Sequence, residues 1–121
     1  MKRRKAFTLV EIMIVVTIIG LLATIAIPSF LKARTTSQKN ACINNLRQID
    51  AAKAQWALET NQAPTATPVA GDLDDYIKYT TSLDADIYCP ADSSRTFTSS
   101  YTINPLTANP VCQIDATNHA L

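Results

Sequence analysis

The sequence predicts an α+β fold in which one long N-terminal α-helix packs against a small antiparallel β-sheet head. Three observations support this fold class. Residues 7–31 are almost continuously apolar, and residues 32–59 place apolar side chains at helical steps of three and four. Residues 95–103 instead alternate with the period of two that is typical of a half-buried β-strand.

The apolar segment 7–31 is long enough to cross a membrane and contains one acid, Glu11. A lone carboxylate in a membrane-spanning helix costs on the order of 2.5–3.5 kcal/mol, so a plain anchor would gain by replacing it. Cleavage between Ala6 and Phe7 would create a cationic α-amino group on Phe7, with a reference pKa of about 8. We expect the Phe7 amine of a neighbouring subunit to offset the charge of Glu11.

The run Lys5-Ala6-Phe7-Thr8-Leu9-Val10-Glu11 resembles the processing motif of type IV pilins and type II secretion pseudopilins. The usual family pattern is Gly followed by Phe-Thr-Leu-x-Glu, so Ala6 is a departure. The resemblance implies cleavage after Ala6 by a prepilin peptidase and N-methylation of Phe7. Because Ala adds only a methyl group where the peptidase approaches the backbone, we expect slower or still competent cleavage.

The same resemblance implies a pilin-like fold and identifies Phe7, Glu11, Gly20 and Pro28 as assembly residues. Gly20 and Pro28 lie at the spacing at which pilins carry a glycine and a proline that weaken the helix. Pro28 lacks an N–H and its ring clashes with the carbonyl of Thr24, so a kink or a local loss of helix is expected. One interpretation is a harmless kink. The other, from the resemblance, is that the helix between Gly20 and Pro28 melts in a filament.

Charge is unevenly distributed along the chain, although the formal net charge is only +1. The net charge is +4 over residues 1–6, +3 over 32–59 and −5 from residue 60 onward. The basic leader should remain cytoplasmic, which directs the C-terminal part outward. A secretory signal cut near Thr24-Ile25-Ala26 and a simple single-pass anchor are alternatives, but the apolar run is long for a signal and neither alternative explains Glu11.

The second half of the helix carries an apolar stripe that needs a partner. The stripe consists of Lys39, Cys42, Ile43, Leu46, Ile49, Ala52, Lys53 and Trp56. No Gly or Pro lies between Ser29 and Glu59, so one helix is predicted from Phe7 to about Glu59, ending near Asn61. The predicted organisation is a cytoplasmic leader over 1–6, a transmembrane and polymerisation helix over 7–31, an amphipathic half-helix over 32–60 and a small head over 61–121.

Within the head, a polar loop around Pro64 and Pro68 precedes a short helix predicted over residues 72–79. A strand over 95–103 and a second strand over 111–114 are predicted to form a hairpin, joined by residues 87–89 in a small antiparallel sheet.

The three cysteines are interpreted from their positions in this fold. Cys89 and Cys112 flank the hairpin of an exported head, so a disulfide is predicted between them, worth about 3 kcal/mol for a loop of roughly 24 residues. Cys42 lies on the apolar stripe and is expected to be a buried thiol, with a bridge as the alternative. No zinc site is expected, because no Cys-x-x-Cys pair exists and the single histidine, His119, lies near the C-terminus in an expected mobile tail.

Catalysis is not expected, because the chain has one histidine and two glycines and lacks nucleophile and phosphate-binding motifs. No cofactor is expected. Calcium binding by head acids is an alternative to ordinary solvated carboxylates, although no EF-hand pattern is present and the Asp-Pro-Trp-Gly stretch of the major type II secretion pseudopilin is missing. The acids concerned are Asp72, Asp74, Asp75, Asp84, Asp86 and Asp92.

The resemblance implies a structural pilin or pseudopilin subunit that assembles into an extracytoplasmic filament for adhesion, motility or secretion. The implied partners are other pilin or pseudopilin subunits, prepilin peptidase, inner-membrane assembly machinery and membrane lipid. The expected location is the inner membrane with the head in the periplasm, and then the filament. An alternative is a minor competence-type pilin that binds DNA or another ligand, but the acidic head disfavours contact with phosphates.

Overall fold

The computed structural model describes residues 5–121, and the predicted leader falls mostly on residues 1–4, outside them. The chain divides into two compact units, residues 1–35 and 36–121. One helix, α1 (Leu9–Thr60), contributes to both units and has 52 residues. This confirms the single long helix expected from the absence of Gly and Pro between Ser29 and Glu59. Pro28 lies inside α1, and helical structure continues without a break on both sides.

In the first unit, the apolar side chains of α1 are solvent-exposed in the isolated chain. Ile14 is 55% exposed, Leu21 66% and Phe30 67%. By length and composition, α1 is also the one described helix that could span a membrane. A surface of this kind is stable only against lipid or against other apolar surfaces, because burying it removes hydrocarbon from water.

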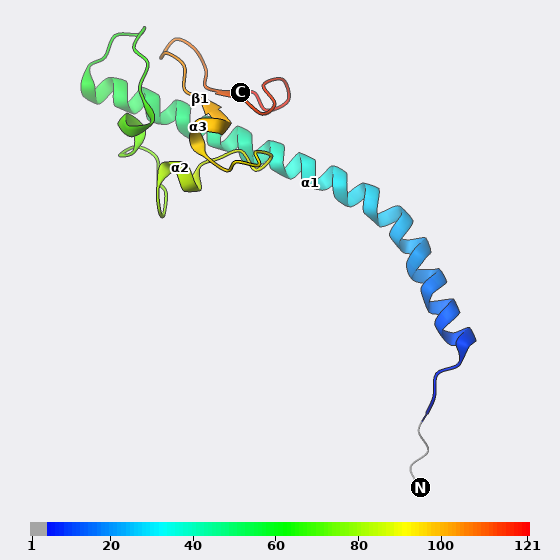
Figure 1. The fold of residues 1–121 in the computed structure, drawn as a ribbon. Coiled ribbons are helices and arrows are strands. Elements are labelled where there is room, and N and C mark those ends of the chain that lie inside the picture. Colours follow the sequence, from blue (N-terminus) through cyan, green and yellow to red (C-terminus); the bar gives the residue numbers. More distant parts are fainter. Residues whose placement is uncertain (1–4) are drawn as a thin grey trace. The chain divides into compact units, whose positions relative to one another are not determined.

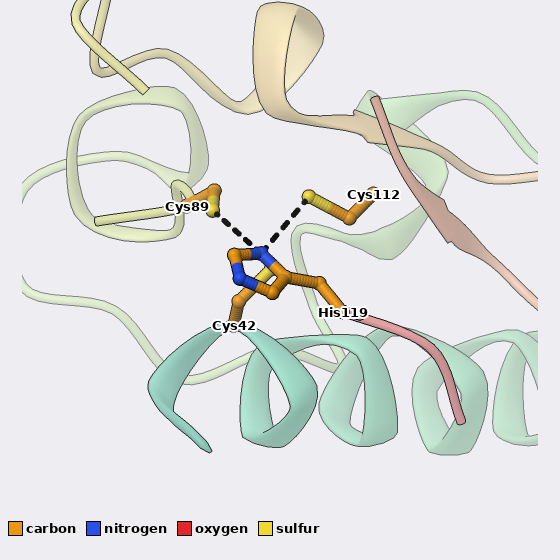
Figure 2. A group of neighbouring side chains, drawn as sticks. All are labelled: Cys42, Cys89, Cys112 and His119. Carbon is orange, nitrogen blue, oxygen red and sulfur yellow. Dashed lines mark hydrogen bonds between the residues drawn. The ribbon is translucent and has the colours of Figure 1, made fainter. Parts of the chain in front are cut away.

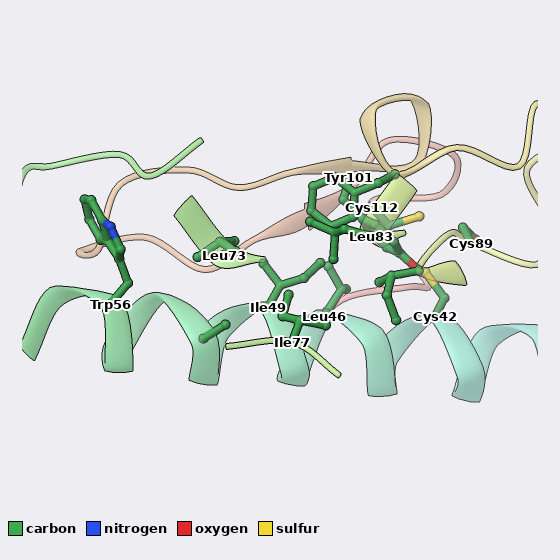
Figure 3. Close-up of a cluster of buried hydrophobic side chains, with 13 residues drawn as sticks. Cys42, Leu46, Ile49, Trp56, Leu73, Ile77, Leu83, Cys89, Tyr101 and Cys112 are labelled. Atoms are coloured by element: carbon green, nitrogen blue, oxygen red, sulfur yellow. The ribbon is translucent and has the colours of Figure 1, made fainter. Parts of the chain in front are cut away.

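In the second unit, the predicted stripe of α1 forms one side of the hydrophobic core. Figure 3 shows Cys42, Leu46, Ile49 and Trp56 following one another along the helix, with Leu73, Leu83 and Tyr101 facing them. The steps of three and four between these helical residues keep them on one face. The head segments therefore lie beside the C-terminal half of α1 (Figure 1), as the pattern predicted.

Helix α1 ends where the sequence suggested. Asn61 follows Thr60 in the left-handed conformation with φ of 52°, and the Gln62 N–H donates to the Ala57 carbonyl at 3.1 Å. Asparagine tolerates this conformation and commonly ends a helix.

The helix predicted over residues 72–79 is wrong in extent. A single 3-10 turn, η1 (Ala70–Leu73), forms instead, and turns follow it. The Asp72 carboxylate accepts the Val69 N–H at 2.9 Å and closes this turn at its start. The next element is the one-turn helix α2 (Leu83–Asp86), whose N-terminus is capped by the Ser82 hydroxyl.

The predicted hairpin is confirmed only at its core. Strand β1 (Tyr101–Thr102) pairs antiparallel with β2 (Val111–Cys112), with Tyr101 opposite Cys112 and Thr102 opposite Val111. Residues 87–89 do not join this two-stranded sheet, so that part of the prediction is wrong.

Residues 97–100 form a short helix, α3 (Phe97–Ser100), where a strand was predicted. The Thr96 hydroxyl caps α3 by accepting the Ser99 N–H at 3.3 Å. The Asp84 carboxylate, from α2, also accepts the Phe97 N–H at 2.9 Å. Serine and threonine favour such local hydrogen bonds over a sheet ladder, which explains why the alternating pattern did not produce a strand.

Lys53 is among the largest fully buried side chains of the head. Its ammonium group donates to three backbone carbonyls, those of Ile103 at 3.0 Å, Pro105 at 3.0 Å and Ala108 at 2.7 Å. The stripe therefore includes a buried charged group near its C-terminal end, and this group holds the loop between β1 and β2 against α1.

Candidate functional site

The predicted processing and assembly residues lie just before α1 and within its N-terminal part. Ala6 and Phe7 are exposed and outside any helix, because α1 begins at Leu9. The Glu11 N–H donates to the Thr8 hydroxyl at 3.3 Å, and the Thr8 N–H donates to the Glu11 carboxylate at 3.4 Å. This reciprocal pair is a capping box, so Glu11 has a local role within one chain that the sequence interpretation missed.

Gly20 and Pro28 lie further along the same helix, and the structure does not bring them together with Phe7 or Glu11. A methyl group added at Gly20 would meet nothing within 4 Å. The hydroxyl of Thr24 donates to the Leu21 carbonyl at 2.7 Å, so this polar side chain is satisfied by its own helix. Phe7, Glu11, Gly20 and Pro28, the four predicted assembly residues, are all exposed in the isolated chain.

A second candidate site gathers the three cysteines and the single histidine of the chain. Cys42, Cys89, Cys112 and His119 are all buried, and their potential ligand atoms all lie within 4.8 Å of one another. The His119 Nδ1 atom lies 3.5 Å from the Cys89 sulfur and 3.7 Å from the Cys112 sulfur (Figure 2).

Each of these four residues comes from a different segment. Cys42 lies on α1 and Cys112 on β2, where its backbone is opposite Tyr101. Cys89 follows α2 in a loop, and its N–H donates to the Ser100 hydroxyl at 2.9 Å. His119 lies in a C-terminal turn, where its N–H donates to the Asp115 carbonyl at 2.9 Å.

Two carboxylates hold the loops that carry Cys89 and His119. Asp92 accepts the Ser100 hydroxyl at 2.8 Å and the Ser94 N–H at 2.8 Å, and it also accepts the Ser99 hydroxyl. Hydrogen bonds from Ser99, Ser94 and Ser100 lower the pKa of Asp92. The Asp92 carboxylate thus orients Ser100, whose hydroxyl accepts the hydrogen bond from the Cys89 N–H.

Asp115 is the carboxylate that holds the turn just before His119. Its carboxylate accepts the Asn118 N–H at 3.0 Å and the Asn118 side-chain amide at 2.9 Å. These bonds lower the pKa of Asp115 and close a turn that directs His119 back into the core.

The thiols occupy an environment that disfavours their charged form in the isolated chain. Burial raises the pKa of Cys42, against a hydrogen bond from the Tyr101 hydroxyl that favours the thiolate. Burial also raises the pKa of Cys89, against a hydrogen bond from the Ala91 backbone N–H. The cluster therefore contains possible ligand atoms and hydrogen-bond donors that favour thiolates. A cation bound among the sulfurs would offset the cost of burying the thiolate charge.

These observations bear on three expectations about the cysteines and the histidine. Cys89 and Cys112 are free thiols and no disulfide joins them in the structure, whereas Cys42 is a buried thiol as expected. His119 is 7% exposed and does not lie in a mobile tail. The argument against a zinc site considered only spacing along the chain, whereas the fold brings possible ligands from four distant segments together.

The acids considered for calcium serve mainly as local hydrogen-bond acceptors. Asp86 accepts the N–H groups of Thr80 and Thr81 at 2.7 and 2.6 Å, and these bonds lower its pKa. Within residues 5–121, no group of these carboxylates gathers as the cysteines and His119 do.

Comparison with known proteins addresses the N-terminal motif directly. Residues 1–27 match the family model described as the prokaryotic N-terminal methylation motif. The chain is 42% identical over 60 residues to the type IV major pilin protein PilA of Myxococcus xanthus, covering 50% of this chain and 27% of the relative. The chain is pilin-like.

Two other relatives extend this pilin-like similarity. The fimbrial protein of Pseudomonas aeruginosa is 39% identical over 69 residues, which is 56% of this chain and 45% of the relative. The type II secretion system core protein G of Klebsiella pneumoniae is 29% identical over 65 residues, which is 54% of this chain and 46% of the relative. The chain thus spans less than half the length of these curated relatives. No solved structure matches it significantly.

The long α1 and the small antiparallel sheet confirm the predicted α+β fold class. The names of these relatives describe a type IV major pilin, a fimbrial protein and a secretion-system core protein, and none of the three names describes an enzyme. The methylation motif and the apolar α1 also agree with anchoring in a membrane.

Proposed function

We propose that this pilin-like protein is a structural subunit that assembles through α1 into an extracytoplasmic filament, a type IV pilus or a type II secretion pseudopilus. The observation that carries the proposal is the methylation motif joined to an exposed apolar helix. A surface that is apolar over residues 9–31 is suited first to lipid and then to the same surface of neighbouring subunits. Other pilin or pseudopilin subunits are the corresponding partners.

Processing is the first step of this proposed function. Prepilin peptidase cleaves after Ala6, and Phe7 becomes the methylated N-terminus. The exposed, non-helical backbone at Ala6 and Phe7 supports this step, because a peptidase requires an accessible bond. Intact-mass analysis of protein extracted from membranes tests it, and a mature species that begins at Met1 or near Ile27 would contradict it.

The orientation of the chain follows from its charges. The basic leader stays in the cytoplasm, the segment 7–31 spans the inner membrane and the head enters the periplasm before assembly. Inner-membrane assembly machinery then draws subunits from lipid into the filament.

In the filament, Glu11 pairs with the Phe7 amine of an adjacent subunit. The capping box offers a competing explanation for Glu11, because Thr8 and Glu11 already satisfy each other within one chain. The charge of Glu11 nevertheless remains without an opposite charge in that box. A buried charge that lacks its partner is strongly disfavoured, so the pair would fix the axial register of neighbouring helices.

Three variants separate the charge of Glu11 from its capping role. Glu11→Gln keeps a capping residue but removes the charge, whereas Thr8→Val removes the cap and keeps the charge. Glu11→Val removes both. We expect both Glu11 variants to insert in the membrane and form few filaments, and Thr8→Val to assemble nearly normally. Wild-type filament yield from Glu11→Gln would refute the pairing.

The biological role is tested by deleting the gene and scoring surface filaments, motility and protein secretion. Loss of filaments supports a pilus subunit, and loss of secretion alone supports a pseudopilin. A minor pilin with a DNA-binding head is not favoured, because Lys78 and Arg95 are the only lysine or arginine residues after Lys53.

A further inference from the structure

We propose that Cys42, Cys89, Cys112 and His119 bind one zinc ion, which acts as a structural link between α1 and the head. The four residues comprise every cysteine and every histidine of the sequence, yet they converge on one buried point from four segments. This site is distinct from the assembly surface of residues 7–31 and does not depend on the proposed filament function.

The two sulfur–nitrogen distances at His119 fit tetrahedral coordination. Zinc–sulfur bonds of about 2.3 Å and zinc–nitrogen bonds of about 2.0–2.1 Å, at tetrahedral angles, place sulfur and nitrogen about 3.6 Å apart. The two sulfur–nitrogen distances given for His119 are 3.5 and 3.7 Å. A disulfide would instead require two sulfurs about 2.05 Å apart and would leave His119 without a role.

The ligand set indicates a closed structural site. Three thiolates and one imidazole satisfy a four-coordinate zinc ion, whereas catalytic zinc sites keep one position for water or substrate. Soft sulfur ligands favour zinc over magnesium or calcium, which prefer oxygen. All four residues are buried, so solvent has little access to the metal.

Binding requires the loss of three protons. One Zn²⁺ ion replaces the protons of the three thiols, which are released to solvent, while neutral His119 donates a lone pair through Nδ1. The zinc ion and its ligands then carry a net charge of −1. Two hydrogen bonds would stabilise this negative charge. The Tyr101 hydroxyl donates to Cys42 and the Ala91 N–H donates to Cys89, and metal ligands commonly have such partners.

The head is of a kind that benefits from a metal. Five short elements, none longer than four residues, make up its regular structure beyond α1. Small folds with so little regular structure commonly rely on disulfides or metals. The proposed zinc ion would link α1, the Cys89 loop, β2 and the C-terminal turn at one point.

The test uses the full-length chain, extracted from membranes in detergent without chelator or added reductant. Elemental analysis should find about one zinc per chain, and all three cysteines should resist alkylation until the metal is removed under denaturing conditions. After metal removal and reduction, Co²⁺ should bind with one-to-one stoichiometry, develop the visible bands of tetrahedral thiolate coordination and be displaced by Zn²⁺.

Variants at His119 provide the matched comparison. His119→Ala should weaken zinc binding by more than the 10- to 100-fold that is typical when a residue hydrogen-bonded to a metal ligand is changed. His119→Cys should retain one zinc, because four thiolates also form a tetrahedral site. Tyr101→Phe, which removes the donor at Cys42 and also the acceptor of the Asn45 side-chain amide, should weaken binding by about 10- to 100-fold.

The wild-type measurements decide the proposal even if a variant fails to fold. A Cys89–Cys112 disulfide in the protein as purified would overturn the zinc site, whatever the reduced chain then binds. Absence of tetrahedral cobalt bands from the reduced wild-type chain would overturn it equally.

Discussion

Replacing Lys53 with methionine tests how the head is held to α1. Methionine keeps most of the aliphatic side chain but removes the ammonium group that donates to the carbonyls of Ile103, Pro105 and Ala108. The loop between β1 and β2 would then lose its anchor. We therefore expect Lys53→Met to destabilise the head and to loosen this loop in particular.

The magnitude follows from opposing contributions. Hydrogen bonds that involve a charged group contribute about 1.5–3 kcal/mol each, so three would total about 5–9 kcal/mol if they were additive. Burial of the ammonium group lowers the pKa of Lys53 and offsets part of that gain. Ile103 and Pro105 are only half-buried and Ala108 is exposed, so water can reach their carbonyls after the change. We expect a net loss of about 2–4 kcal/mol in the free energy of unfolding.

Urea unfolding of the full-length chain in detergent measures this loss through the fluorescence of Trp56, the single tryptophan, which lies in the head core. Hydrogen exchange provides a local readout, because the Leu106 N–H donates to the Ala66 carbonyl and the Ala108 N–H to the Pro105 carbonyl. Both amides should exchange faster in the variant.

Lys39→Met is the matched control, since Lys39 lies on the same helix and is only partly buried. Its effect should remain within about 0.5 kcal/mol. If Lys53→Met also stays within that range and the loop amides keep their protection, the three carbonyl contacts do not hold the head.

Two further predictions concern α1 and the acidic groups of the head. Gly20→Ala should stabilise α1 by about 1 kcal/mol without a steric clash, raising helicity in detergent, and it should reduce filament extension under force if the helix melts between Gly20 and Pro28. Equal extension of the two filaments would contradict that melting. Hydrogen bonds from Thr81 and Thr80 lower the pKa of Asp86 below its usual value near 3.8. Between the lowered pKa and pH 3.8, Asp86 therefore binds a proton more readily in the unfolded chain than in the folded chain. The stability from Asp86 is present above about pH 3.8 and lost as pH falls through its lowered pKa. Asp86→Asn should therefore show a smaller loss of stability with acid in urea titrations, and an unchanged acid dependence would contradict this account.

The features that sequence alone could predict are those controlled by local pattern. The stripe from Cys42 to Trp56 repeats at helical spacing, and it lies on the core side of α1 because any helix of that sequence places those side chains on one face. The end of the helix at Asn61 and a hairpin that joins the segments around Tyr101 and Cys112 were similarly accessible from short-range signals. The motif around Phe7 and Glu11 is also local, and the family comparison supports it.

Tertiary structure decided what depended on residues distant in the chain. Phe97 begins a helix partly because Asp84, thirteen residues earlier, accepts its N–H, and no alternating pattern reveals that contact. Cys42 and His119 are separated by most of the head, so their spacing has no resemblance to a zinc motif. They meet because the core packs the C-terminal turn against α1, and only the packed structure places their ligand atoms within reach of one ion.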